Sequence, residues 1–243
     1  CAITKNYMLV FDLSVVFDLY KLGRGYFPFS WDDNHQSRIG LLSRNGDSNE
    51  VKWFEIDRTY FFHTFNAHED ANGNVIVTAA AYGRLFDTDW NGPFTESPPQ
   101  LTKWELNTKS GQATSTRLDD RSVEFPRINP SLVGKSNQYA YALASSNTIE
   151  PDFKEIVKYD FKNDTSEVYE YGPGKFGAEP VFVAAEGAKS EDEGYLLSLV
   201  YNQETDTSNL IILNAKEPKS GPLATVHLPQ RVPHGFHGEW IKI

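Results

Sequence analysis

Four polar residues stand out because they lie in apolar or glycine-rich surroundings and recur at nearly equal intervals. They are His63, Glu124, Glu179 and His237, separated by 61, 55 and 58 residues. A charged group beside apolar strand residues is costly to bury unless another group pairs with it. We therefore expect these residues to have polar partners, and their regular spacing makes them candidate partners of one another.

Two imidazoles and two carboxylates that meet at one place favour a metal site. In one arrangement, His63 and His237 bind iron(II) with one carboxylate, as in the triad of non-haem iron enzymes. The candidates for that carboxylate are Glu69, Glu124 and Glu179. In a second arrangement the acids do not bind the metal but accept the second ring N–H of each ligand histidine. A polar cluster that holds only water is the third alternative, and spacing alone leaves all three open.

The elements that carry these residues read as short strands rich in Val, Ile, Phe, Tyr, Trp and Thr, which predicts an all-β fold. Three segments share one pattern, a strand that ends at Asn or Asp and resumes after a polar turn. They are residues 101–107, 155–160 and 210–214, with turns at 109–111, 163–165 and 219–221. Their final Asn and Asp residues are 53 and 54 positions apart. This interval predicts a β-propeller of four-stranded blades, with a β-sandwich as the alternative.

In a propeller, residues at equivalent positions of successive blades converge on the central axis, so the interval would bring the four polar residues together. The 243 residues hold about four and a half units of this length, at the low end of propeller sizes. The chain starts at Cys1, and residues 6–12 already read as a strand, so we expect upstream blades to be missing. Residues 84–100 lack periodicity and contain three prolines, which is typical of a loop that is either a lid or a plain surface loop.

Composition excludes several classes of function. The net charge is −10 and no basic cluster is present, so nucleic acid is a poor partner. No apolar run reaches the roughly 18 to 20 residues of a transmembrane helix. The single cysteine excludes an intrachain disulfide and a cysteine-based zinc site, and it fits the reducing cytoplasm, which is the location we expect.

Taken as an ordered set, several stretches resemble the carotenoid cleavage oxygenase family, which includes stilbene-cleaving dioxygenases and retinoid isomerases. The matching stretches are CAIT (1–4) with the strand region 7–18, SRIG (37–40), WFE (53–55), HTFNAHED (63–70), EFPRIN (124–129), EPVFV (179–183), EDEG (191–194) and GFHG (235–238). They run from one end of the chain to the other, and their specificity lies in the set.

The resemblance implies a seven-bladed β-propeller that holds iron(II) on its axis through four histidines. Residues 1–243 would be the C-terminal portion of this single domain, with about four blades, while the N-terminal blades and two upstream ligands would lie outside the chain. By position, His63 and His237 would be the third and fourth iron ligands. Glu124 and Glu179 would be the carboxylates that support the ligand histidines.

Three further residues of the motifs are given no role at the metal. His68 stands where the family often has Tyr, so it is not expected to bind iron. Glu69 and Asp70 match the HTFNAHED stretch, but the resemblance assigns them no catalytic function. Seven aromatic residues are candidates for a substrate channel or for ordinary blade core. They are Phe61, Phe62, Phe65, Phe125, Phe182, Phe236 and Trp240.

The activity implied for the complete protein is oxidative scission of a conjugated C=C bond of a carotenoid, apocarotenoid or stilbene. Dioxygen would be the second substrate, and a dry apolar tunnel would select the bond. An isomerase that uses the same iron and a non-catalytic binding propeller are the alternatives. A substrate dissolved in lipid suggests peripheral membrane contact, although no amphipathic helix is evident. We expect the chain alone neither to close a propeller nor to hold iron tightly, and its oligomeric state stays open.

Overall fold

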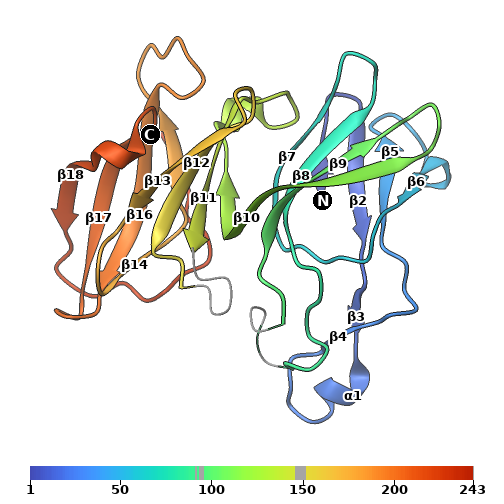
Figure 1. Ribbon diagram of the computed structural model, residues 1–243, viewed down its shortest axis with the longest axis horizontal. Coiled ribbons are helices and arrows are strands. Elements are labelled where there is room, and N and C mark those ends of the chain that lie inside the picture. Colours follow the sequence, from blue (N-terminus) through green and yellow to red (C-terminus); the bar gives the residue numbers. More distant parts are fainter. Residues whose placement is uncertain (91, 93–95, 146–151, 243) are drawn as a thin grey trace. The chain divides into compact units, whose positions relative to one another are not determined.

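The computed structural model describes residues 1–90, 92, 96–145 and 152–242. These residues form two compact units built of antiparallel strands (Figure 1). Unit 1 comprises residues 1–122 and 133–136, and unit 2 comprises residues 123–132, 137–145 and 152–242. The one α-helix in the described part of the chain is a single turn, α1 (Leu19–Leu22). The predicted all-β class is therefore confirmed.

Unit 1 contains two sheets over a common core. The first sheet has the order β1 (Ala2–Ile3), β2 (Tyr7–Asp12), β5 (Arg38–Ser43), β6 (Lys52–Glu55), with the 3-10 helix η1 (Ser48–Glu50) before β6. The second begins with β7 (Thr64–Glu69), β8 (Val75–Ala81) and β9 (Gln100–Leu106). Large apolar side chains of both sheets form one buried cluster that includes Leu9, Ile39, Phe54, Val77 and Trp104. Burial of this apolar surface drives the two sheets together.

A carboxylate also joins the two sheets of unit 1. Glu69, the last residue of β7, accepts hydrogen bonds from Thr4 Oγ1 at 2.6 Å, Asn6 N at 2.8 Å and Asn6 Nδ2 at 2.6 Å. Thr4 and Asn6 lie in the turn between β1 and β2. Burial raises the pKa of Glu69, but these hydrogen bonds outweigh burial and hold its pKa below the ordinary value. Glu69 is thus a structural tie between sheets.

β3 (Val15–Phe17) and β4 (Phe29–Trp31) pair as a small two-stranded ribbon, and α1 lies in the connection between them. Asp18 caps α1 by accepting from Tyr20 N and Lys21 N, which satisfies two of the free N–H groups at the helix start. Lys21 is 3% exposed, and its Nζ donates to Phe29 O at 2.9 Å and Phe86 O at 2.7 Å. This lysine therefore ties α1 to the beginning of the predicted loop at residues 84–100.

That loop is anchored where the structure describes it. Leu85 and Phe86 are buried, and Glu96 accepts hydrogen bonds from Asp87 N at 3.1 Å and Asp89 N at 2.9 Å. Residues 91 and 93–95 of the prediction lie outside the described residues. The role of the loop as a lid stays a prediction.

One long strand, β10 (Ala113–Arg127), runs from unit 1 into unit 2 (Figure 1). Residues 113–117 and Ser122 pair with β9, with a register shift between Arg117 and Ser122. In the sheet order β10 is also the neighbour of β11 (Tyr139–Ser145). The register shift marks an irregularity that bends a strand and increases its twist. Because β10 is continuous, β7 to β13 form one seven-stranded path in the pairing order, and the division into four-stranded blades stays a prediction.

Unit 2 continues that path and adds a further sheet. β11, β12 (Glu155–Asp160) and β13 (Thr165–Glu170) pair in sequence. The further sheet contains β14 (Lys175–Gly177), β15 (Val181–Ala184), β16 (Gly194–Asn202), β17 (Thr207–Asn214) and β18 (Pro222–His227), with β14 and β15 both paired to β16. Two 3-10 helices, η2 (Pro130–Leu132) and η3 (Pro218–Ser220), lie in connections. In β16 every second residue from Gly194 to Val200 is buried, as expected for a strand with one face on the core.

The repeated pattern found in the sequence corresponds to a repeated turn. Asn107 Oδ1 accepts from Lys109 N at 3.0 Å, and Asp160 Oδ1 accepts from Lys162 N at 3.1 Å. Asn214 Oδ1 accepts from Lys216 N at 2.9 Å. In each case a short side chain hydrogen-bonds to the backbone two residues later and ends the strand. The predicted strand–turn–strand units at 101–107, 155–160 and 210–214 are confirmed as β9–β10, β12–β13 and β17–β18.

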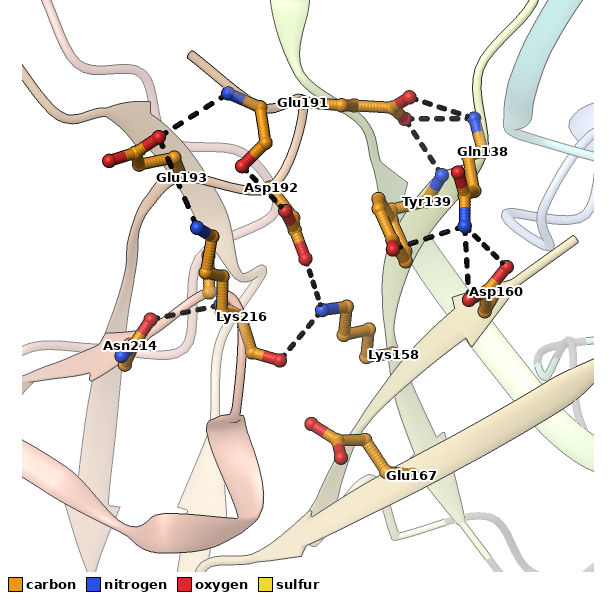
Figure 2. A network of polar contacts seen from close by, with 12 residues as sticks. Gln138, Tyr139, Lys158, Asp160, Glu167, Glu191, Asp192, Glu193, Asn214 and Lys216 are labelled. Atoms are coloured by element: carbon orange, nitrogen blue, oxygen red, sulfur yellow. Dashed lines mark hydrogen bonds and ion pairs between the residues drawn. The ribbon is translucent and has the colours of Figure 1, made fainter. Parts of the chain in front are cut away.

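An acidic loop, Glu191 to Glu193, joins the two sheets of unit 2 (Figure 2). Glu191 accepts from Gln138 N at 2.9 Å and from Tyr139 N at 2.7 Å, at the start of β11. Asp192 accepts from Lys158 Nζ of β12 at 2.8 Å, and the same Nζ donates to Lys216 O at 2.8 Å. The Lys158 and Asp192 side chains are only 8% and 10% exposed. The loop is therefore a charged cross-link inside the unit.

The described strands leave every sheet open, with an edge strand at each end. Among the described residues, no helix is long and apolar enough to cross a bilayer.

The buried pair Lys158–Asp192 leads to a first prediction. Lys158→Met removes the cation and leaves the Asp192 carboxylate buried without its charge partner, which we expect to cost about 3 to 5 kcal/mol. Thermal and denaturant unfolding of the full-length protein measure the loss. The double variant Lys158→Met/Asp192→Leu removes both charges, and we expect it to be more stable than the single variant. Equal stability of the single variant and the wild type would contradict a structural role for the pair.

Glu69 leads to a second prediction, with a definite pH dependence. Glu69→Gln replaces one accepting oxygen by an amide and should lower stability at neutral pH by about 1.5 to 3 kcal/mol. Because the pKa of Glu69 is lowered on folding, its contribution is present above the unfolded value of 4.5 and disappears as pH falls through the folded value. The difference in melting temperature between wild type and Glu69→Gln should therefore shrink below about pH 4. A difference that stays constant from pH 7 to pH 3 would refute this assignment.

Candidate metal centre

A buried carboxylate and a histidine form a direct pair in unit 2. Glu179 lies between β14 and β15, and its side chain is 5% exposed. Its Oε1 is 3.1 Å from His237 Nδ1. Its Oε2 accepts from Gly238 N at 2.9 Å and from Arg127 Nη2 at 2.9 Å. The predicted association of Glu179 with His237 is thus present in the structure, and Arg127 is a third member.

This pairing fixes the chemistry of the imidazole ring. A carboxylate accepts but does not donate when ionised, so Nδ1 of His237 is the nitrogen that carries the proton. In the neutral ring the lone pair is then on Nε2, which is the form that binds metal ions. The His237 side chain is 53% exposed, and the buried Glu179 carboxylate contacts the ring at Nδ1. The donor set therefore fits a histidine metal ligand supported by a carboxylate.

Arg127 is the charge partner of the buried Glu179 carboxylate, with Nη2 2.9 Å from Oε2. Burial lowers the pKa of the Arg127 guanidinium, but the hydrogen bond and the negative charge of Glu179 outweigh this and raise its pKa. Arg127 also donates to Gly238 O, and its Nη1 donates to Glu239 Oε2 at 3.2 Å. Sequence reasoning missed this residue. The available signal was a lone cation three positions after Glu124, in a strand with buried apolar neighbours.

Glu124, the second predicted carboxylate, lies in β10 and is 2% exposed. Its Oε2 accepts from Phe125 N at 2.8 Å. Phe125 has φ = 53°, a left-handed conformation that a bulky residue rarely adopts. Such strain costs about 1 to 3 kcal/mol and is concentrated at functional sites. The Phe125 ring lies 5.7 Å from that of His237, edge to face, so the strained residue contacts the proposed ligand.

His63, the other predicted ligand, belongs to unit 1 and lies directly before β7. It is half-buried, and its carbonyl oxygen accepts from Ala80 N at 3.1 Å. Glu124, Glu179 and His237 belong to unit 2. The convergence of His63 with these residues stays a prediction.

Glu69 had been one candidate carboxylate for a triad with the two histidines. Its oxygens are engaged by Thr4 and Asn6, which argues against a role at a metal. Asp70, the next residue, accepts from Asn72 N and Asn74 N and shapes the turn between β7 and β8. His68 is half-buried in β7, where burial lowers its pKa.

The seven candidate aromatic residues separate by burial. Phe61, Phe65 and Phe182 are 4% to 5% exposed and belong to the core. Phe62, Phe236 and Trp240 are 41%, 79% and 55% exposed. Phe125 is the candidate that contacts His237. Within the described part of the chain, no group of three or more His, Cys, Asp or Glu side chains is placed to hold a metal ion.

Known proteins resemble this chain over most of its length. A family model described as retinal pigment epithelial membrane protein (RPE65) matches residues 1–242. The carotenoid cleavage oxygenase of Mycobacterium tuberculosis is 35% identical over 88% of this chain and 44% of its own length. The carotenoid 9,10(9′,10′)-cleavage dioxygenase of Crocus sativus is 33% identical over 99% of this chain and 47% of its own length.

The solved structure of cobalt-substituted Synechocystis apocarotenoid oxygenase (ACO) is similar over the whole chain. Its TM-score is 0.90 at 26% sequence identity, and the match covers 100% of this chain and 52% of the oxygenase. The chain thus spans about half the length of the relatives that it matches. With the family model matched from residue 1 to residue 242, the chain belongs to the RPE65 family, to which the resemblance to carotenoid cleavage oxygenases pointed.

Proposed function

We propose that the full-length protein carrying this chain is a non-haem iron(II) dioxygenase that cleaves a conjugated C=C bond of a carotenoid, apocarotenoid or stilbene. The observation that carries this proposal is the buried carboxylate of Glu179 against Nδ1 of His237. This pair orients the ring of a candidate ligand histidine in a chain of the RPE65 family. The names of the two relatives favour a carotenoid over a stilbene.

The strand order supports a partial propeller as the scaffold. Four antiparallel groups succeed one another along the chain: β1 to β6, β7 to the first part of β10, the second part of β10 to β13, and β14 to β18. His63 precedes the first strand of the second group, Glu124 lies in the first strand of the third, and Glu179 lies between the first strands of the fourth. We infer four of seven blades, with these residues at equivalent axial positions.

Iron(II) is the metal that this proposal assigns to the site. Neutral imidazole nitrogen is a suitable ligand for iron(II), and the carboxylate partner partly offsets the charge of the cation. Cobalt substitution in the similar oxygenase supports a first-row metal in a site of this type. His63 and His237 would bind it, and Glu124 and Glu179 would hold the ligand rings.

In this proposal, the residues of this chain position the metal ligands and do not react themselves. When bound, iron(II) supplies the redox chemistry by which dioxygen splits the double bond into two carbonyl groups. Glu179 holds the proton on Nδ1 of His237 and so keeps the lone pair on Nε2. Phe125 covers one edge of the His237 ring with an apolar surface, which limits water beside the ligand.

The histidine assignment gives a third prediction. In the full-length protein, His63→Ala and His237→Ala should remove nearly all bound iron, and Glu179→Gln should weaken iron binding about 10- to 100-fold. Iron content after purification and a titration with Fe²⁺ without dioxygen measure both effects. His68→Tyr is the matched control, since His68 lies five positions after His63 and is given no metal role.

The products formed from an apocarotenoid then decide the reaction. Two shorter carbonyl products support cleavage, and retention of the carbon count would show an isomerase. Wild-type protein without stoichiometric iron would favour a binding propeller and refute the metal assignment.

We also propose peripheral membrane contact through an exposed apolar patch around α1, in residues 17–27. Its exposed members are Phe17 (57%), Leu19 (74%), Tyr20 (58%), Leu22 (48%), Tyr26 (41%) and Phe27 (46%). Exposed apolar residues gathered in one segment are typical of interaction sites, and they fit access to a substrate dissolved in lipid. Lys21 holds this segment by two backbone hydrogen bonds, so the patch has a fixed support.

The patch gives a fourth prediction. Leu19→Glu/Leu22→Glu should reduce co-sedimentation of the full-length protein with phosphatidylcholine vesicles at least tenfold, because two charges would enter the lipid interface. Leu223→Glu changes an equally exposed leucine (60%) in β18 of unit 2 and should have no effect. Equal vesicle binding of the double variant and the wild type would contradict this surface.

A further inference from the structure

The proposed ligand His237 lies in a segment without regular secondary structure. No strand follows β18 in the described residues, and the segment up to residue 242 is mostly exposed. Its large apolar residues Phe236, Trp240 and Ile241 are 79%, 55% and 77% exposed, so apolar packing within this chain does little to hold it. Upstream, Val232 N donates to Ser208 Oγ at 2.9 Å, and the His234 ring packs edge to face against Tyr201 and Phe176. Polar contacts, together with the Phe125 ring, therefore help to position His237.

Arg127 and Glu179 make polar contacts with three consecutive residues, His237, Gly238 and Glu239. We name this group of five residues the Arg127 clamp. Glu179 holds the ring at Nδ1 and the backbone at Gly238 N. Arg127 holds the same peptide from its other side, at Gly238 O, and reaches Glu239 Oε2 at 3.2 Å. It also donates to Glu179 Oε2 at 2.9 Å. The Arg127 guanidinium thus links Glu179 to the segment around His237, which Glu179 orients.

Only an arginine fits this arrangement. Its planar fork carries several N–H donors in fixed directions, whereas lysine offers one compact ammonium. Nη2 of Arg127 serves both Glu179 and Gly238 O, while Nη1 serves Glu239. The Nε atom of Arg127 is buried and has no hydrogen-bond partner among the described residues. Leaving a buried donor unpaired is unfavourable, so the contacts at the two Nη atoms decide where the side chain lies.

The base of the clamp is held by the acidic loop. Asn129, two residues after Arg127, donates from Nδ2 to Glu191 O at 2.9 Å. The Glu191 carboxylate is itself fixed by Gln138 N and Tyr139 N at the start of β11 (Figure 2). On the other side of Arg127, Pro126 is buried. Arg127 therefore projects from a strand end that is anchored on both sides.

We propose that Arg127 is a positioning residue for His237, acting through Glu179 and the Gly238 peptide. This inference rests on the proposed function for its consequence at the metal, but the clamp itself involves only residues of this chain. Loss of the guanidinium would free the segment around His237 and leave Glu179 as a buried charge with one partner fewer. Both effects would misplace the imidazole relative to the other ligands.

The test uses the full-length protein and two independent measurements. Arg127→Met should speed hydrogen exchange at the Gly238 amide about tenfold, which corresponds to the loss of one charge-assisted hydrogen bond. The dissociation constant for Co²⁺, followed by its visible absorption, should rise about tenfold. Arg127→Lys should restore neither value fully, because it returns the charge without the fork. Arg117→Met, at an exposed arginine of unit 1, should change neither.

The outcomes separate the clamp from the proposed function. Wild-type exchange at Gly238 as fast as at Gly235, whose backbone has open space around it, would overturn the clamp even if Arg127→Met fails to fold. Unchanged exchange and Co²⁺ affinity in a folded Arg127→Met would overturn it as well. Wild-type protein that binds no Co²⁺ would reject the proposed metal function, while faster exchange in Arg127→Met would still support the clamp.

Discussion

A carboxylate buried between β strands needs partners for its charge and its lone pairs, and this requirement organises the candidate site. Glu179 meets it with the guanidinium of Arg127 and with the imidazole and backbone N–H of the neighbouring residues His237 and Gly238, so its partners come from two separate places in the sequence. Removing any one partner leaves a charge in surroundings where water cannot replace it. Glu179 therefore holds the segment around His237 in place, and that segment supplies two of the polar contacts that Glu179 requires.

The same physical requirement joins the sheets within each unit. In unit 1, Glu69 of β7 binds the turn between β1 and β2. In unit 2, Glu191 and Asp192 bind β11 and β12 from the loop before β16. Apolar cores bring the sheets together without selecting a register, because the hydrophobic effect has no direction. Hydrogen bonds to carboxylates do have direction, and they fix which strand ends meet.

The two histidines predicted to bind a metal are supported in different ways. A histidine at the edge of a strand, such as His63, takes its place from the backbone ladder that starts beside it. His237 has no such ladder, so side chains must replace it. The Arg127 clamp, the left-handed Phe125 and the acidic loop all lie within unit 2 and serve this end. The proposed site thus depends on contacts made by residues that bind no metal.

The sequence by itself determined the local structure. Short segments rich in β-branched and aromatic residues predicted strands, and the repeated Asn107, Asp160 and Asn214 predicted turns, because a short side chain that bonds to its own backbone acts within a few residues. The resemblance to a known family also selected Glu179 and His237, whose pairing the structure contains.

Only the tertiary structure decided the partners. Arg127 and Glu239 are 112 positions apart, Lys158 and Asp192 are 34 apart, and nothing in their neighbourhoods indicates that they meet. The continuous β10, which links the pairing order from β7 to β13, was equally hidden. Hydrogen bonds between distant side chains depend on how sheets pack and where strands bend, and a pattern of neighbouring residues does not encode either.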